Sequence, residues 1–297
     1  MKRLLFILLF FLTFTATVFK VSAQDAKVII PQPLVGQFYP IYNDWLVPTN
    51  EVPFKDINFI FIAFAHVYSN NEKPASIILS YENARKEKTK LTAGDFDSDR
   101  IRKLISVAKK ANPNMKFLIS MGWNTDGKDW KLIIDDYDSG VNSFPQSVLE
   151  FLVNNNLDGF DIDYESIPKQ VTSEKLTEIL KEVYELLHQP GKKQYILSIT
   201  PAETGSLTET NLALFDIVNP QTYASWVKID QYTKLNVPTD KISYGICTDP
   251  NYNPNVKDAI AKYKNDQLRG IFNWSMQSDQ QNYDFKITEE MSAILKK

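Results

Sequence analysis

The chain has 297 residues, of which 43% are hydrophobic and 23% charged, and its formal net charge at pH 7 is −3. This composition is typical of a globular protein: it is too apolar for a disordered chain and lacks the basic excess of a nucleic-acid binder. A single cysteine excludes a disulfide framework and a cysteine-based metal cluster, and two histidines leave little for a zinc site. We therefore expect a folded protein that binds no nucleic acid.

The first 23 residues have the pattern of a secretory signal peptide. Lys2 and Arg3 give a positive start, Leu4–Leu12 is an unbroken apolar run, and residues 21–23 (Val-Ser-Ala) resemble a cleavage site. The run is short for a membrane span, which needs roughly 18 apolar residues, so an uncleaved anchor is the weaker alternative. Cleavage would remove three basic side chains and no acidic one, leaving 30 basic against 36 acidic residues and a net charge of −6. We expect a secreted or periplasmic protein without stable membrane insertion after cleavage.

Residues 24–297 contain short apolar, β-rich runs followed by helical patterns, with no linker or repeat between them. Eight runs predict strands: Leu34–Tyr39, Ile57–Ala65, Lys116–Met121, Leu157–Asp163, Tyr195–Thr200, Phe215–Tyr223, Ile242–Cys247 and Gly270–Trp274. Amphipathic spacing predicts helices at Ser98–Ala111, from Ser143 onward and at Ser173–His188. Eight strands alternating with helices predict one domain with the α/β fold of a (β/α)8 TIM barrel. The alternative is a doubly wound open sheet, but neither glycine-rich phosphate-binding pattern occurs.

One predicted strand ends in a cluster of acids. Asp161, Asp163 and Glu165 alternate along the strand, so they point to one face with neighbours roughly 7 Å apart. Three carboxylates on one buried face must share protons and hydrogen bonds, and their proximity raises the pKa of at least one of them. A carboxyl that keeps its proton near neutral pH is what a general acid requires. The alternatives are a solvated acidic turn and a calcium loop, although Phe160 and Ile162 between the acids are atypical of calcium loops.

Residues 158–165, with the sequence DGFDIDYE, resemble the DGxDxDxE signature of glycoside hydrolase family 18, the chitinases and their relatives. Weaker resemblances follow in the family's order. Residues 120–123 (SMGW) are similar to the SxGG motif, and residues 221–224 (QTYA) are similar to the Q-x-Y-N variant of the MxYD motif. Residues 270–274 (GIFNW) are similar to the strand whose tryptophan forms the floor of a sugar subsite. The resemblance extends over all of residues 24–297, and Asp158, off the acidic face, is expected to be structural.

This resemblance implies a retaining, substrate-assisted mechanism in which the substrate's own acetamido oxygen is the nucleophile. It implies that Glu165 protonates the glycosidic oxygen, that Asp163 holds the acetamido N–H, and that Asp161 supports Asp163 from below. Tyr223 is expected to position the acetamido oxygen. The substrate-binding residues implied are Gln221, Trp274, Phe38 and Ser120. The resemblance implies neither a metal nor a cofactor, and it requires a substrate with an N-acetyl group.

Some of these residues have alternative interpretations. Ordinary core packing is the alternative for Trp274 and Phe38, and the alignment of Phe38 could shift to Tyr39. Glu203, just after the fifth predicted strand, is the one acid placed to serve as a conventional nucleophile, which would leave Asp163 without a purpose.

The loop lengths predict a compact barrel. Only residues 248–269 separate the last two predicted strands, too few for an inserted domain, and the longer insertion lies at Tyr68–Phe96. An open cleft suits internal cleavage of a polymer, so we predict a monomeric, endo-acting chitinase-like hydrolase acting beside N-acetylglucosamine in a polysaccharide or glycan. The alternatives are an endo-β-N-acetylglucosaminidase acting on N-glycan cores and a weakly active or inactive carbohydrate-binding relative. Trp123 and Ala224, which depart from the family motifs, favour the latter.

Overall fold

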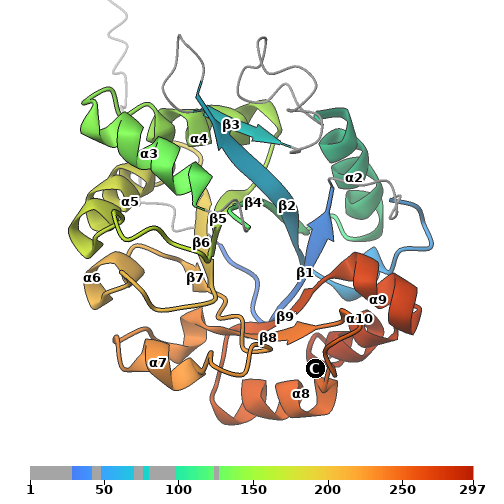
Figure 1. Cartoon of the computed structure of the whole chain (residues 1–297). Helices are drawn as coiled ribbons and strands as arrows, with labels where there is room; N and C mark the ends of the chain where they lie inside the picture. Colours follow the sequence, from blue (N-terminus) through green and yellow to red (C-terminus); the bar gives the residue numbers. More distant parts are fainter. Residues whose placement is uncertain (1–28, 42–47, 70–75, 80–97, 124–126, 297) are drawn as a thin grey trace, which may run out of the picture.

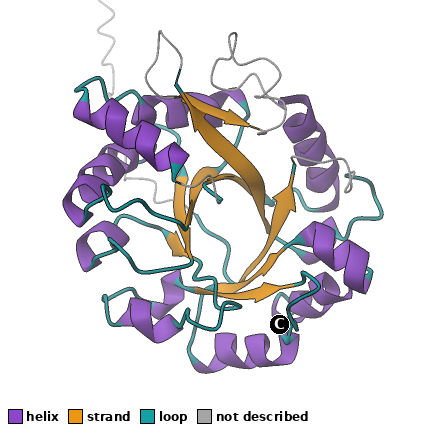
Figure 2. Ribbon diagram, in the orientation of Figure 1, coloured by secondary structure: helices purple, strands orange, loops and turns teal. Residues whose placement is uncertain are grey.

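The computed structural model describes residues 29–41, 48–69, 76–79, 98–123 and 127–296. Within these ranges, eight parallel strands form a ring with helices outside it (Figures 1 and 2). The strands are β1 (Leu34–Pro40), β2 (Phe59–Tyr68), β3 (Ser76–Leu79), β4 (Lys116–Met121), β5 (Gly159–Tyr164), β6 (Ile196–Pro201), β7 (Ile217–Val218), β8 (Ser243–Cys247) and β9 (Gly270–Trp274). Their order around the ring is β7-β6-β5-β4-β2-β1-β9-β8, and β3 pairs antiparallel with β2 outside this order. The predicted (β/α)8 fold is confirmed.

The helices cover the outer face of the ring. They are α2 (Ser98–Ala111), α3 (Lys128–Asp138), α4 (Phe144–Asn154), α5 (Ser173–Leu187), α6 (Glu209–Leu212), α7 (Ile229–Thr233), α8 (Val256–Asn265), α9 (Met276–Tyr283) and α10 (Lys286–Met291), with short 3-10 turns at Phe54–Asp56, Thr239–Lys241 and Ser292–Ile294. No helix in the described ranges is long and apolar enough to cross a membrane. The predicted signal peptide lies outside the described residues and stays a prediction, and β3 is part of the insertion expected after β2.

Seven of the eight predicted strands have bounds within three residues of those observed, and the exception is β7. This strand has two residues instead of the predicted nine because Pro220 lies only two residues after its end, and proline has no N–H to donate to a ladder. Two contacts close the ring between β7 and β8. One is an isolated bridge between Val218 and Ile242, and the other is the Thr222 hydroxyl, which lies 2.8 Å from both the N and the O of Gly245.

The core has two layers, as the alternation of strand side chains requires. Inside the ring lies an aromatic-rich cluster made of Leu34, Phe38, Phe59, Phe61, Ala63, Phe64, Leu118, Ile196, Ile217 and Phe272. A larger cluster fills the space between the strands and the helices. The filled interior makes the barrel a rigid support, so the chemistry is confined to the end of the ring where the strands terminate.

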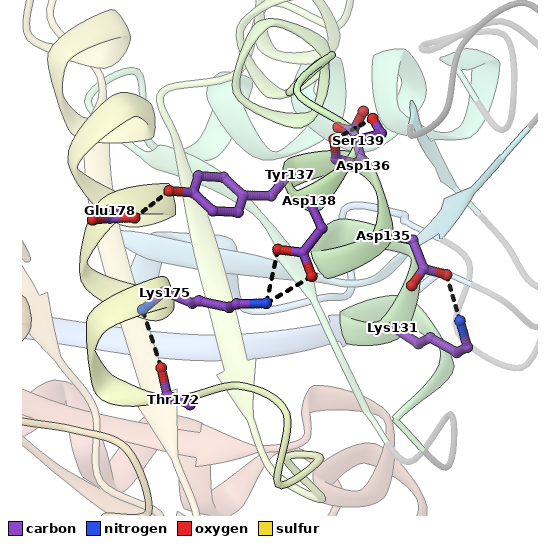
Figure 3. Close-up of polar contacts among 9 residues, drawn as sticks. All are labelled: Lys131, Asp135, Asp136, Tyr137, Asp138, Ser139, Thr172, Lys175 and Glu178. Atoms are coloured by element: carbon purple, nitrogen blue, oxygen red, sulfur yellow. Dashed lines mark hydrogen bonds and ion pairs between the residues drawn. The ribbon is translucent and has the colours of Figure 1, made fainter.

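Helix α3 was not predicted, and it packs beside α5 through polar contacts on the surface (Figure 3). Lys175 donates to both carboxylate oxygens of Asp138 at 2.7 and 2.6 Å, and the Tyr137 hydroxyl donates to Glu178. Thr172 caps α5 by accepting the Lys175 backbone N–H. We refer to Asp138, Lys175, Tyr137 and Glu178 as the α3–α5 network.

Candidate active site

Strand β5 places its acids between the hydroxyl-bearing ends of β4 and β6. Asp161 pairs in register with Ser120 on β4 and Ser198 on β6. Its fully buried carboxylate accepts hydrogen bonds from Ser120 at 2.7 Å, Ser198 at 2.6 Å and Thr200 at 3.0 Å. Burial raises the pKa of Asp161 to about 6, against the opposing effect of these three donors.

Asp163 and Glu165 form a pair one step further along the same face. Asp163 is 4% exposed, whereas Glu165 is half-buried. Burial raises the pKa of Asp163 well above its ordinary value, and the adjacent Glu165, through its charge and a hydrogen bond, raises it further. The Asp163 carboxyl therefore favours its protonated form, and it lies beside Glu165, the expected general acid.

A glycine at the end of β4 permits this close packing. Gly122 has φ +138°, and a Cβ on it would lie 2.1 Å from the carbonyl oxygen of Asp163, so no other residue fits. Trp123 follows in the left-handed region, with φ +51°, where the SxGG motif has its second glycine. Its ring lies parallel to Phe64 at a centroid distance of 5.8 Å and is 43% exposed. Trp123 thus adopts a backbone conformation that favours glycine, and it adds an exposed aromatic surface.

Trp274 lies at the end of β9, across the ring from β5. Its half-buried ring packs on Phe64 at 5.4 Å and Phe38 at 5.5 Å between centroids, and its indole N–H donates to Asp249 at 3.1 Å. Phe38 is 2% exposed and also stacks on Phe61 at 4.9 Å. Phe38 therefore packs against both Trp274 and Phe61, and its expected sugar contact stays a prediction.

Two other predicted substrate-binding residues also have protein partners. Ser120 is fully buried and its hydroxyl donates to Asp161, and its expected sugar contact stays a prediction. The amide of Gln221 donates to Asp163 at 2.8 Å and lies 3.5 Å from Glu165. The family resemblance led us to expect both residues near the acids, and both contact them, but their exact partners depend on the register between strands.

Tyr223 follows β7 and is half-buried beside the acid pair. Burial raises the pKa of its phenol well above the ordinary value, and the nearby Asp163 adds to this effect. The phenol therefore stays protonated and able to donate. Its ring packs edge-on against Tyr252 at 5.7 Å and Phe272 at 6.4 Å. A cavity of about 210 Å³ borders Tyr223 and Tyr252.

The two other acids near β5, Asp158 and Glu203, accept hydrogen bonds from backbone N–H groups. Asp158 accepts the Phe117 backbone N–H at 3.0 Å and lies 3.7 Å from the Lys116 ammonium, as the expected structural role requires. Glu203 is exposed, and its carboxylate accepts the Ile167 backbone N–H at 3.3 Å.

Sequence reasoning missed Ser198, Thr200, Phe64 and Asp249. Ser198 and Thr200 alternate along β6, Phe64 lies within β2, and Asp249 follows β8 by two residues. The alternating hydroxyls of β6 are the one signal that could have identified part of this set.

Comparison with known proteins decides the family. The model of glycosyl hydrolases family 18 matches residues 38–282. This chain belongs to glycosyl hydrolase family 18. The resemblance of residues 158–165 to the family signature is thereby confirmed, and with it the assignment as a chitinase-like glycoside hydrolase.

Solved structures show how family 18 architecture is realised here. The class V chitinase from Nicotiana tobaccum is 15% identical, with a TM-score of 0.70 covering 89% of this chain and 99% of that one. A chitinase from Cycas revoluta in complex with (GlcNAc)3 is 16% identical, with a TM-score of 0.69 covering 88% and 99%. A chitinase-like agglutinin from Robinia pseudoacacia is 15% identical, with a TM-score of 0.67 covering 87% and 98%. At these identities the likeness concerns the fold alone, and the near-complete coverage identifies the compact family 18 barrel.

Proposed function

We propose that this family 18 hydrolase cleaves β-1,4 bonds next to N-acetylglucosamine in chitin or chito-oligosaccharides by a retaining, substrate-assisted mechanism. One observation carries the proposal: Asp163, on β5, and Glu165, directly after it, lie close together on one face, where the Gln221 Nε2 is 2.8 Å from the first and 3.5 Å from the second. Two carboxyls placed in this way cannot approach a sugar from opposite sides, as the mechanisms with two opposed carboxylates require. The nucleophile must therefore come from the substrate.

Each group has one task in this reaction. Glu165 gives its proton to the glycosidic oxygen as the bond to the anomeric carbon breaks, and the acetamido oxygen of the same sugar forms a new bond to that carbon. Asp163 accepts a hydrogen bond from the acetamido N–H and stabilises the positive charge of the oxazolinium intermediate. Tyr223 donates to the acetamido oxygen. Water then opens the intermediate after giving a proton to Glu165, which restores the acid.

Trp274, packed on Phe38 and Phe64, is the surface that we expect to bind the sugar. Trp274 is half-buried, braced by Phe38 and Phe64, and held by Asp249, so its free face is a rigid surface for the apolar side of a sugar. The Cycas chitinase of the same fold was solved with a GlcNAc oligomer, which supports N-acetylglucosamine as the recognised unit. We propose that the enzyme acts as an exported monomer and cuts within the polymer.

Mass-spectrometric product analysis tests the proposal. Residues 24–297 are incubated in parallel with chito-oligosaccharides and with a high-mannose glycoprotein, and we expect only the former to be cut. A glycoprotein left with a single GlcNAc would instead assign glycan release, and binding without cleavage would assign a lectin-like role. A thiazoline analogue of the oxazoline intermediate is expected to inhibit, and failure of inhibition would contradict the substrate-assisted step.

A further inference from the structure

Gln221 lies against the acid pair, and its side-chain amide has three acceptors. Its Nε2 is 2.8 Å from Asp163 Oδ1, 3.4 Å from the Thr200 carbonyl oxygen and 3.5 Å from Glu165 Oε1. An amide group has two N–H donors, so these three acceptors engage its whole donor capacity. The side chain is only 8% exposed. The amide is therefore part of the acid pair and has no N–H left to offer a sugar.

The two contacts of the amide with the pair are unequal. Burial, Glu165 and Asp161 all disfavour a negative charge on Asp163, and each raises its pKa. The Gln221 hydrogen bond acts in the opposite direction because it stabilises the ionised carboxylate. Its distance to Asp163 is 2.8 Å against 3.5 Å to Glu165, so it stabilises a charge on Asp163 more than a charge on Glu165.

Two phenols also face the pair. Tyr223, from the loop after β7, interacts electrostatically with both acids, and Tyr252, from the loop after β8, interacts with Glu165. Burial raises the pKa of each phenol, and the nearby acids raise it further, so both stay neutral while the carboxyls titrate. Cys247 lies near both phenols, and burial raises the pKa of its thiol to about 12, so it too stays neutral. The titration of the pair therefore depends on Asp161 and on the Gln221 donor.

We propose that Gln221 is a positioning residue that allows the proton shared by the acid pair to pass from Asp163 to Glu165. The O–H bond on Asp163 breaks and an O–H bond on Glu165 forms along their hydrogen bond, so the negative charge moves to Asp163 and the net charge of the pair is unchanged. The Gln221 amide stabilises the charge where it arrives. Glu165 then holds the proton that the glycosidic oxygen receives. This inference rests on the proposed function and adds to it the residue that prepares the acid.

The substitution Gln221→Met removes both donors while keeping a flexible side chain of similar length. Loss of this donor raises the pKa of the Asp163 carboxyl. On chitotetraose we expect the kcat/KM pH profile to move up by about one pH unit, with kcat falling about tenfold at the original optimum. KM is expected to change less than threefold, because the amide does not contact the sugar. A raised KM with an unmoved profile would show a sugar contact and overturn the inference.

The matched control is Gln194→Met. The Gln194 amide donates to the carbonyl oxygens of Gln189 and Lys192 before the start of β6, at the opposite end of the barrel from the acids. The same chemical change there is expected to leave the pH profile in place. If Gln221→Met lowers the unfolding temperature too far, Gln221→Asn, which retains a shorter amide, is expected to give a smaller shift in the same direction.

A measurement without turnover separates this inference from the proposed function. The full chain, carrying 13C-labelled Asp and Glu carboxyls, is titrated by NMR as wild type and as Gln221→Met. We expect the Asp163 signal to titrate at higher pH in the variant. Such a shift in a protein that cuts no glycan would contradict the proposed function and leave the inference standing. Identical titration curves would overturn the inference even in an active hydrolase.

Discussion

Carboxylates gather both at the end of β5 and in the α3–α5 network, but the two regions satisfy them by different means. At β5, Asp161 is fully buried and is held by three hydroxyl groups, and no lysine or arginine within the described ranges forms an ion pair with it. In the α3–α5 network, Asp138 is half exposed and pairs with the Lys175 ammonium (Figure 3).

The difference in burial determines how each region affects the charge of its carboxylates. A hydroxyl stabilises a carboxylate without neutralising it, so burial can still raise the pKa of Asp161 to about 6. In the exposed network, water already solvates both charges, and an ion pair contributes little. Where no described lysine or arginine pairs with it, a buried acid such as Asp161 holds its proton closer to neutral pH, whereas Asp138 on a helix surface forms an exposed ion pair.

The largest effect is expected at the acid pair. Glu165→Gln removes the proton donor while preserving shape, so hydrolysis of chito-oligosaccharides is expected to fall by about 10² to 10⁴-fold with binding largely retained. Kinetics and calorimetric binding check this. The matched control is Glu203→Gln, on an exposed acid near β6, which is expected to change the rate less than twofold. Equal losses in the two variants would indicate a conventional nucleophile and contradict the assignment.

A smaller effect is expected from Asp161→Asn, seen in how stability depends on pH. Because the folded pKa of Asp161, about 6, exceeds the unfolded value near 4, the folded state binds more protons between these values. The contribution of Asp161 to the free energy of unfolding is fully present below pH 4. About 3 kcal/mol of it is lost as the pH rises through 6. Urea unfolding at pH 4 and pH 7 is expected to show this loss in the wild type but not in the variant. If the wild type and the variant lost the same unfolding free energy between pH 4 and pH 7, burial would not control the pKa of Asp161.

The smallest effect is expected in the α3–α5 network. Lys175→Met breaks the ion pair with Asp138 but keeps the aliphatic stem, so the free energy of unfolding is expected to fall by less than about 1 kcal/mol. Denaturant unfolding in low and high salt measures it. Lys181→Met, on the same helix and paired only within it to Glu185, provides the baseline. A loss of several kcal/mol would contradict the prediction that the exposed Asp138–Lys175 pair matters less than the buried acids of β5.

Local sequence determined the framework of this protein. The apolar runs of β4 and β9 and the amphipathic spacing of α2 gave these elements their observed bounds, because their patterns depend only on the residues within them. The alternation of Asp161, Asp163 and Glu165 likewise placed three acids on one face of β5, since strand periodicity is fixed by the backbone.

Tertiary structure decided which partners those acids have. Ser120, Ser198 and Gln221 come from three other segments, and only the register of β4 and β6 and the early end of β7 bring their donors to the acids. The same holds for Phe38, which became a support for Trp274 because the barrel interior closes over it. Hydrogen bonds and desolvation act over a few ångströms between segments far apart in the chain. The sequence therefore determined where the acids lie, and the closure of the barrel decided which of them hold protons.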